Sequence, residues 1–193
     1  VLARVTRGED PKLGKKVAVV GGGNVAMDCA RTARRLGAEV DILYRRREVD
    51  MPADVEEIVE SKAEGVNIVV QAIPTGVKLG PDGSALVSWG RAHMVDQGPG
   101  KRPLPELMPE TVREVRYDTI VAAIGQGPDL SFIAADAADG LEVKRYKPVV
   151  DATGRTGDPK VWAGGDLVNE KKDAISAIAD GHRAALAIDR ALR

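Results

Sequence analysis

Short apolar runs alternate with amphipathic segments along the first part of the chain. Residues 17–20 form a continuous apolar run, which is typical of a strand buried on both faces. Residues 25–36 carry apolar or small side chains at helical spacing and are followed by Gly37, a helix stop signal. Residues 39–44 have the pattern of a second strand. This order predicts a strand, helix, strand unit with parallel strands and a right-handed crossover.

The alternation continues through a second helix and then changes. Residues 52–64 are rich in Glu near their start and end at Gly65, which predicts a helix, and residues 67–72 predict a third strand. The helical pattern disappears between residues 75 and 117, where short apolar runs are separated by turns rich in Pro and Gly. We expect a β-meander here, with one long exposed loop at 98–109.

The last part of the chain returns to apolar runs and ends in a helical pattern. Residues 119–124 predict another buried strand, which ends at Gly125. Residues 148–151 and 161–163 predict two short strands, and residues 173–192 predict a final helix. The order of elements along the whole chain indicates an α/β fold.

The first 14 residues differ from the rest of the chain. They are charged and punctuated by Gly8, Pro11 and Gly14, so we expect a linker at 1–14 and a domain that begins at residue 15. The chain also starts at Val1 and not at a Met, which suggests a fragment of a longer protein.

Composition and charge exclude several classes of function. Lys and Arg total 28 and Asp and Glu total 29, so no charge imbalance draws the chain to nucleic acid or to an anionic membrane. No apolar run approaches the roughly 20 residues that cross a bilayer. Cys29 is the only cysteine, which excludes an internal disulfide and a multi-cysteine metal site within this chain. A reducing, cytoplasmic setting is the expectation.

The turn between the first strand and the first helix carries the strongest chemical signal. It consists of Gly21, Gly22, Gly23, Asn24, Val25 and Ala26, and we call residues 21–26 the glycine turn. Its spacing fits the G-x-G-x-x-G/A fingerprint of dinucleotide sites. Gly21 permits the tight turn, Gly23 lets a pyrophosphate approach the backbone, and Ala26 lets helix and sheet pack closely. The alternative is a glycine-rich turn that binds nothing.

The end of the second strand predicts which nucleotide binds. A site selective for NAD places an acidic residue there, whereas this chain has Arg45, Arg46 and Arg47, which we call the arginine run. Guanidinium groups suit a 2′-phosphate, so the sequence predicts NADPH. The alternative is a solvated basic run whose members pair with Glu48, Asp50 or Asp54.

Other candidate groups have no partners of the right kind in the sequence. Cys29 lies on the first predicted helix and is interpreted as a buried structural thiol. His93 and His182 are lone histidines and are interpreted as structural or surface residues. The sequence therefore predicts no catalytic residue and no metal ligand in this chain.

The glycine turn and its surroundings resemble a known family. Residues 14–32, Gly-Lys-Lys-Val-Ala-Val-Val-Gly-Gly-Gly-Asn-Val-Ala-Met-Asp-Cys-Ala-Arg-Thr, resemble the NADPH domain of the glutamate synthase small (beta) subunit family. That family also includes the nucleotide-handling part of dihydropyrimidine dehydrogenase. The match continues in order through residues 44–47, 51–53, 64–66, 123–128 and 161–166, and so covers nearly the whole chain.

The resemblance implies a domain organisation. Residues 15–126 would form a Rossmann-like, three-layer NADPH-binding domain with the β-meander, and residues 127–193 the C-terminal part of an FAD-binding domain. This chain has no second glycine-rich fingerprint, so the first half of the flavin site is absent from it. We therefore expect these residues alone to bind FAD weakly or not at all and to be inactive.

The resemblance also assigns residues to the flavin side of the site. Gly165 and Asp166 would contact FAD, and the backbone near Ala174 and Ile175 would face the isoalloxazine. Gly125 and Gly127 would let the backbone approach the place where the nicotinamide and the flavin meet, and Gly125 and Gln126 are assigned to cofactor binding.

The intact enzyme is expected to be an NADPH-dependent flavin oxidoreductase. Hydride would pass from NADPH to FAD. One cysteine cannot form the dithiol of a thioredoxin reductase, so electrons would leave the flavin for another carrier, and the resemblance implies iron–sulfur centres on a partner segment or subunit. Two other functions stay open for the chain: a non-catalytic NADP(H)-binding or interaction module without its own FAD, and a structural domain whose glycines serve packing alone.

Overall fold

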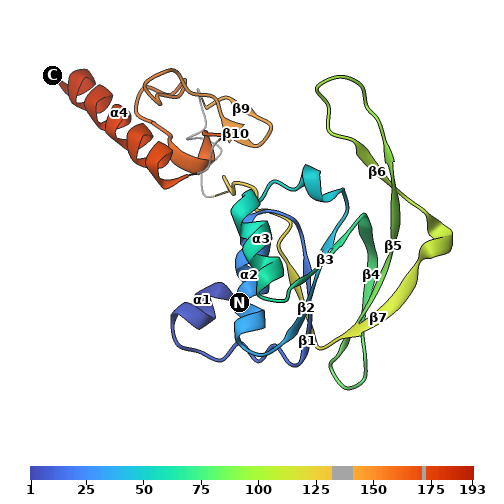
Figure 1. Cartoon of the computed structure of the whole chain (residues 1–193). Helices are drawn as coiled ribbons and strands as arrows, with labels where there is room; N and C mark the ends of the chain where they lie inside the picture. Colours follow the sequence, from blue (N-terminus) through green and yellow to red (C-terminus); the bar gives the residue numbers. More distant parts are fainter. Residues whose placement is uncertain (132–140, 171–172) are drawn as a thin grey trace. The chain divides into compact units, whose positions relative to one another are not determined.

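The computed structural model describes residues 1–131, 141–170 and 173–193 of the chain. It divides into two compact units, Val1–Gly125 and Gln126–Arg193, which we call unit 1 and unit 2 (Figure 1). Each unit is described by itself.

Unit 1 is built on a four-stranded parallel sheet. Its strands are β1 (Lys16–Val20), β2 (Glu39–Tyr44), β3 (Asn67–Val70) and β8 (Thr119–Ala122), in the order β3-β2-β1-β8. The central strand β1 pairs with β2 on one side and β8 on the other, and its residues 17–19 are fully buried. The apolar run in the sequence therefore marks a strand that is covered on both faces, as expected for a parallel sheet.

Two helices cover one face of this sheet. Helix α2 (Asn24–Arg35) connects β1 to β2, and α3 (Val55–Ala63) lies between β2 and β3 (Figure 1). The buried face of α2 consists of Ala26, Met27, Cys29, Ala30 and Ala33. These small side chains let α2 pack closely on the sheet, and they share one hydrophobic cluster with residues of β1, β2 and α3.

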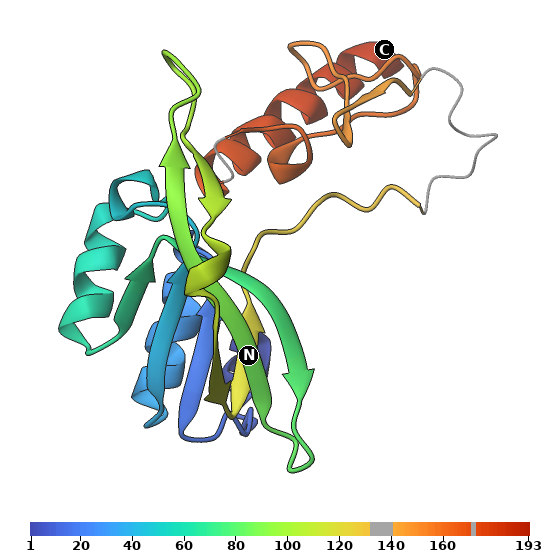
Figure 2. The ribbon, with the colours of Figure 1, turned by 90° about the vertical axis from the view of Figure 1, so that its right-hand side faces the viewer.

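An antiparallel sheet covers the other face. It contains β4 (Ala72–Leu79), β5 (Ala85–Val95), β6 (Leu104–Leu107) and β7 (Arg113–Tyr117), with β5 in the middle. Figure 2 shows β5 as a long curved strand. Buried residues of β4, β5 and β7 form a second cluster with Ala18 and Leu43 of the parallel sheet. Unit 1 thus has three layers, and the expected α/β, Rossmann-like fold with a meander is confirmed.

Three details differ from the sequence-based expectation. The expected exposed loop at 98–109 contains β6, which gains backbone partners by pairing with residues 92–95 of β5. The expected strand 67–72 breaks at Gln71, whose φ of 50° is left-handed, so that the chain leaves the parallel sheet as β3 and enters the antiparallel one as β4.

The third difference is at the N-terminus, where a linker was expected. Helix α1 (Leu2–Thr6) begins the chain, Val1 and Leu2 pack against the first hydrophobic cluster, and Leu13 is buried in that cluster. The segment is charged along most of its length, but these three apolar side chains anchor it to unit 1.

Unit 2 has less regular structure. It contains a two-stranded hairpin of β9 (Val143–Lys144) and β10 (Lys147–Pro148), a 3-10 turn η4 (Gly165–Leu167) and the helix α4 (Ala174–Leu192). The expected strand at 161–163 is reduced to a single bridge between Arg155 and Trp162. The expected strand at 148–151 contributes only Pro148 to β10.

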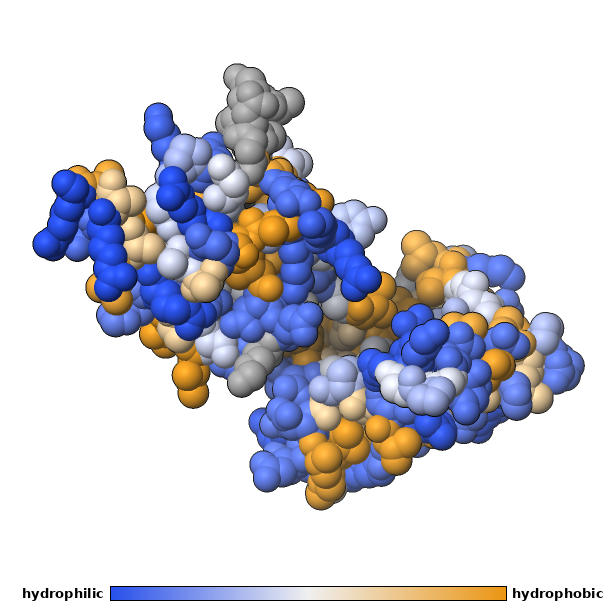
Figure 3. Space-filling model, turned by 90° about the horizontal axis from the view of Figure 1, so that it is seen from above, coloured by the Kyte–Doolittle hydropathy of each residue, from blue (hydrophilic) through white to orange (hydrophobic). Residues whose placement is uncertain are grey.

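The described part of unit 2 has no hydrophobic core of the kind seen in unit 1. Within residues 126–131, 141–170 and 173–193, only Pro148 and Thr156 are buried. Helix α4 buries none of its residues, and its exposed apolar side chains are Ile175, Ile178, Leu186 and Leu192. On the face that Figure 3 shows, hydrophobic patches are scattered among hydrophilic residues.

Candidate functional site

The first two glycines of the glycine turn are required by packing. Gly21 has φ of 144°, and a Cβ placed on it would lie 2.2 Å from the carbonyl oxygen of Ala123. A Cβ on Gly22 would lie 2.4 Å from the ring of Tyr44. Neither position accepts a side chain without moving the backbone or the tyrosine, so these glycines fix the turn between β1 and α2.

The third glycine, Gly23, is different. It is the N-cap of α2 with an extended φ of −96°, and a Cβ on it would have Pro52 Cγ, 3.8 Å away, as its nearest neighbour. Protein packing therefore does not require a glycine here. The missing side chain leaves open space at the N-terminus of α2, as a pyrophosphate that approaches the backbone needs.

The amides at this helix start are available. Within the described residues, neither Asn24 N–H nor Val25 N–H has a hydrogen-bond acceptor, and Val25 is 59% exposed. Unpaired amides and the positive end of the helix dipole together favour an anion. The residues present thus fit a phosphate group at this place.

A short loop holds the glycine turn in position. Asn24 Nδ2 donates to Asp54 Oδ2 over 2.9 Å, and Asp54 N–H donates back to Asn24 Oδ1 over 2.8 Å. Ala53 N–H donates to the carbonyl of Gly22 over 3.1 Å. We call Asn24 and Asp54 the turn brace. Ala53 therefore supports the turn from outside through its backbone.

The three members of the arginine run have different surroundings. Arg47 makes two hydrogen bonds to Asp50, of 2.9 and 3.1 Å, and these hold the pKa of that carboxyl below its ordinary value. Arg46 Nε donates to the carbonyl of Pro103 over 3.0 Å. Arg45 is exposed, and among the described residues it has no hydrogen-bond or ion-pair partner. The alternative of surface pairing thus describes Arg47 but not Arg45.

A fourth arginine, Arg102, reaches the same end of β2. It donates to Tyr44 Oη over 3.3 Å and to the carbonyl of Asp50. Arg102 lies 58 positions from Tyr44 in the sequence, in the connection between β5 and β6. Sequence reasoning missed it because no local pattern shows that this connection folds back to β2.

Gly125 and Gln126 lie where the two units meet along the chain. Gly125 follows β8 with φ of 95°, and no atom lies within 4 Å of a Cβ placed on it. It is the last residue of unit 1, and the exposed Gln126 is the first of unit 2. A positive φ explains why glycine occupies position 125.

In unit 2, the candidate flavin residues lie in the turn η4, which holds Gly165 and Asp166, and at the start of helix α4, which holds Ala174 and Ile175. Gly165 has φ of 64° and its N–H donates to Asp180 Oδ2 over 3.0 Å, so this amide is already paired within the unit. Asp166, Ala174 and Ile175 are exposed. Unit 2 therefore presents an exposed carboxylate and an exposed helix start.

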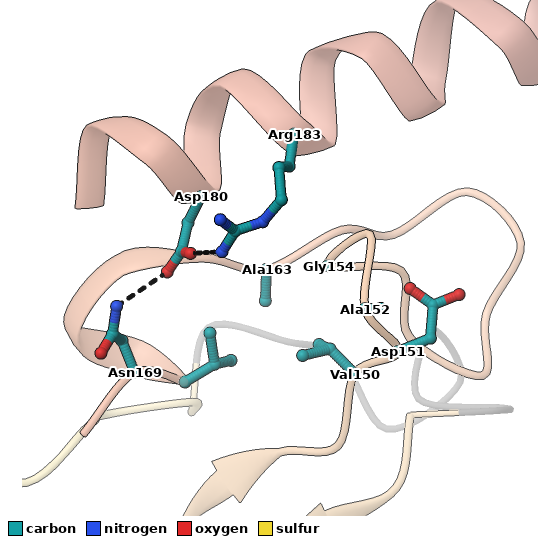
Figure 4. Close-up of a pocket in the computed structure, with 9 residues that line it drawn as sticks. Val150, Asp151, Ala152, Gly154, Ala163, Asn169, Asp180 and Arg183 are labelled. Atoms are coloured by element: carbon teal, nitrogen blue, oxygen red, sulfur yellow. Dashed lines mark hydrogen bonds and ion pairs between the residues drawn. The ribbon is translucent and has the colours of Figure 1, made fainter. Parts of the chain in front are cut away.

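A cavity of about 340 Å³ lies beside Asp180 on the same unit. Asp180 accepts from Asn169 Nδ2 over 3.2 Å and pairs with Arg183, as Figure 4 shows. Val150 and Ala163 contribute apolar lining. The acceptors of Asp180 are already used by its neighbours, so its role is to tie η4 to α4.

Cys29 and the two histidines lie in the surroundings that the sequence predicts. Cys29 is buried in the first cluster, and burial raises the pKa of its thiol, so it stays protonated. His93 and His182 are exposed. In residues 1–131, 141–170 and 173–193, no three side chains of the metal-binding types gather around one point. Over the same ranges, every helix is too short or too polar to span a bilayer.

Comparison with known proteins identifies the family. The family described as "Pyridine nucleotide-disulphide oxidoreductase" matches residues 1–181. The chain belongs to this family. The resemblance to glutamate synthase small chains is also confirmed: the chain is 32% identical to "Glutamate synthase [NADPH] small chain" of Escherichia coli over 180 residues, 89% of this chain and 38% of that protein.

Two other relatives are more similar to this chain. The "NADP(+)-dependent formate dehydrogenase subunit beta" of Moorella thermoacetica is 44% identical over 187 residues, which cover 93% of this chain and 25% of the relative. The "NADPH-Fe(3+) oxidoreductase subunit beta" of Geobacter sulfurreducens is 37% identical over 95% of this chain and 30% of the relative. The chain thus spans about a quarter to two fifths of the length of these relatives.

A solved structure supports the fold. Thioredoxin reductase of T. acidophilum superposes with a TM-score of 0.69 at 24% identity, over 90% of this chain and 51% of that one. The family is one of oxidoreductases that use pyridine nucleotides, which accords with the dinucleotide fingerprint in the glycine turn.

Proposed function

We propose that unit 1 binds NADPH, with the pyrophosphate at the glycine turn and the 2′-phosphate at Arg45 and Arg46. The observation that carries the proposal is Gly23: its missing side chain leaves open space in front of two unpaired helix amides, and protein packing gives no reason for that space. A bound phosphate gives one.

The charge at the end of β2 supports NADPH over NADH. Arg45 offers a planar fork without a partner of its own among the described residues. The nearby carboxylates are engaged: Asp50 pairs with Arg47, and Asp41 accepts from Tyr117 Oη over 2.8 Å and from Asn67 over 2.7 Å. Neither Asp50 nor Asp41 is therefore free to bind a ribose 2′-hydroxyl there.

The wider role that we propose is that of the NADPH module of a flavin-dependent oxidoreductase. When bound, NADPH and FAD supply hydride transfer and electron storage. Residues 15–126 hold and orient the pyridine nucleotide, and Gly125 and Gln126 lead the chain to the flavin side. Residues 127–193 contribute Gly165, Asp166 and the start of α4 to the flavin site. Electrons would then leave for iron–sulfur centres or a partner subunit.

A titration tests the nucleotide assignment. Calorimetry with the full 193-residue chain should show NADPH binding at least tenfold more tightly than NADH, since a hydrogen bond to a charged group contributes about 1.5–3 kcal/mol. Arg45→Met should remove most of this preference and leave NADH affinity unchanged. Equal affinity of the two nucleotides, or an Arg45→Met variant that keeps the full preference, would contradict the assignment.

A second candidate is a non-catalytic NADP(H)-binding module. It is favoured by the single glycine-rich turn in the sequence and by the few buried residues in the described part of unit 2. We expect this chain, as it stands, to bind FAD weakly and to reduce ferricyanide with NADPH at a negligible rate even when FAD is added. NADPH oxidation that rises with added FAD to saturation would instead show a complete active site in these residues.

A further inference from the structure

The connection between β5 and β6 folds back onto the end of β2. Two consecutive residues of this connection make the contact: Arg46 Nε donates to the carbonyl of Pro103 over 3.0 Å, and Arg102 donates to Tyr44 Oη and to the carbonyl of Asp50. We call residues 96–103 the returning loop. It places a side chain from the antiparallel layer beside the arginine run of the parallel layer.

Tyr44 connects this place to the glycine turn. Its ring lies so close to Gly22 that a Cβ there would be 2.4 Å from it, and its hydroxyl donates to the carbonyl of Asp50 over 2.6 Å. Arg102 contacts that same hydroxyl. One tyrosine ring therefore separates the Arg102 guanidinium from the turn on which the proposed pyrophosphate rests.

Arg102 makes no ion pair with a carboxylate among the described residues, although it lies close enough to Asp50 to help lower the pKa of that carboxyl. Its acceptors there are a phenol oxygen and a backbone carbonyl, both uncharged, and only Nη2 takes part. The acidic residues nearby have other partners, since Asp50 is paired with Arg47 and Glu48 with Lys62. A guanidinium has five N–H donors, so Arg102 keeps donors for an anion while two neutral oxygens hold it in place.

We propose that Arg102 is a second determinant of NADPH specificity, which joins Arg45 in binding the 2′-phosphate. This inference rests on the proposed function of unit 1. Two guanidinium groups from different layers match the oxygen-rich, doubly charged phosphate better than one. The returning loop thereby becomes part of the nucleotide site, although it lies far from the glycine turn in the sequence.

The test measures nucleotide preference in matched variants of the full chain. Arg102→Met keeps the aliphatic stem and removes the charge, and Lys101→Met removes the same charge from the neighbouring exposed residue. Calorimetry with NADPH, NADH, 2′,5′-ADP and 5′-AMP gives four dissociation constants for each protein. Arg102→Met should weaken the binding of NADPH and of 2′,5′-ADP about tenfold. This is the low end of the range for a hydrogen bond to a charged group, because the site is exposed. The dissociation constants for NADH and 5′-AMP should stay within twofold of those of the original protein. Lys101→Met should change none of the four dissociation constants by more than twofold.

The outcomes separate this inference from the proposed function. If the unmodified chain prefers NADPH and Arg102→Met keeps that preference, the inference is wrong and the proposed function stands. If Arg102→Met weakens NADPH and NADH equally, Arg102 only supports the turn at Tyr44, and the inference is again wrong. If the unmodified chain binds no NADPH, both fail. Arg102→Lys keeps the positive charge but not the planar guanidinium, so it should retain part of the preference for NADPH over NADH. It replaces Arg102→Met in the test if that variant does not fold.

Discussion

Replacing Gly23 with Ala should remove nucleotide binding and leave the fold intact. The new Cβ would have its nearest neighbour, Pro52 Cγ, at 3.8 Å, which is an ordinary contact, and φ of −96° suits alanine. The methyl group would instead occupy the space in front of the amides of Asn24 and Val25. Folding and binding therefore respond differently to the same substitution.

The expected effects of Gly23→Ala on stability and on NADPH affinity can be worked out from the contacts of residue 23. Alanine is a poorer N-cap than glycine by roughly 0.5–1 kcal/mol, and the reduced freedom of the unfolded chain offsets this by about 0.4–1 kcal/mol. The free energy of unfolding should thus change by less than about 1 kcal/mol. Loss of one phosphate hydrogen bond costs about 1.5–3 kcal/mol, so NADPH should bind at least tenfold more weakly.

Substitutions of two other glycines provide a destabilising comparison and a neutral control. Gly22→Ala drives a methyl group into the Tyr44 ring and should destabilise the fold by about 1–3 kcal/mol. Gly76→Ala, on β4, meets nothing within 4 Å and serves as the control that changes neither property. Urea unfolding and NADPH calorimetry on all three variants form the assay. A Gly23→Ala protein that binds NADPH within twofold of the original would refute the reasoning.

Two further substitutions test the supports of the site and of the fold. Asn24→Ala removes both hydrogen bonds of the turn brace, so urea unfolding should show a loss of about 1–2 kcal/mol, and an unchanged value would mean that the brace contributes nothing. Glu64 accepts hydrogen bonds from Arg35 and Arg31, which hold its pKa below the ordinary value of 4.5. The stability that Glu64 contributes is therefore present above pH 4.5 and is lost as the pH falls through the lowered pKa. Glu64→Gln should lower the melting temperature at neutral pH, and the gap to the original protein should narrow in acid; a gap that stays constant with pH would contradict this linkage.

The elements of unit 1 that bury long apolar faces can be predicted from the sequence pattern. The run at β1 and the small side chains of α2 have one stable arrangement, because a strand covered on both faces and a helix with a small-residue face must pack together. The glycine turn is predictable as well, since Gly21 and Gly22 are explained by backbone geometry and by Tyr44. The spacing of the glycines is therefore visible in the sequence, although the contacts that require Gly21 and Gly22 come from Ala123 and Tyr44 on other parts of the chain.

Contacts made across long sequence distances could not be predicted in the same way. Leu13 gives no periodic signal within a charged segment, yet it is buried in the core of unit 1. The arginine run looks uniform in the sequence, whereas the structure pairs Arg47 with Asp50, holds Arg46 at Pro103 and leaves Arg45 exposed. Arg102 joins them only because β5 and β6 pair and return the chain to β2. These assignments depend on tertiary geometry, which residue order alone does not specify.

A crystal structure of this chain with NADPH tests the central claim most directly. The pyrophosphate should lie against the amides of Asn24 and Val25 beside Gly23, with the 2′-phosphate within hydrogen-bond distance of Arg45. A nucleotide found elsewhere on the protein, or one whose 2′-phosphate points away from the arginines into solvent, would contradict the account.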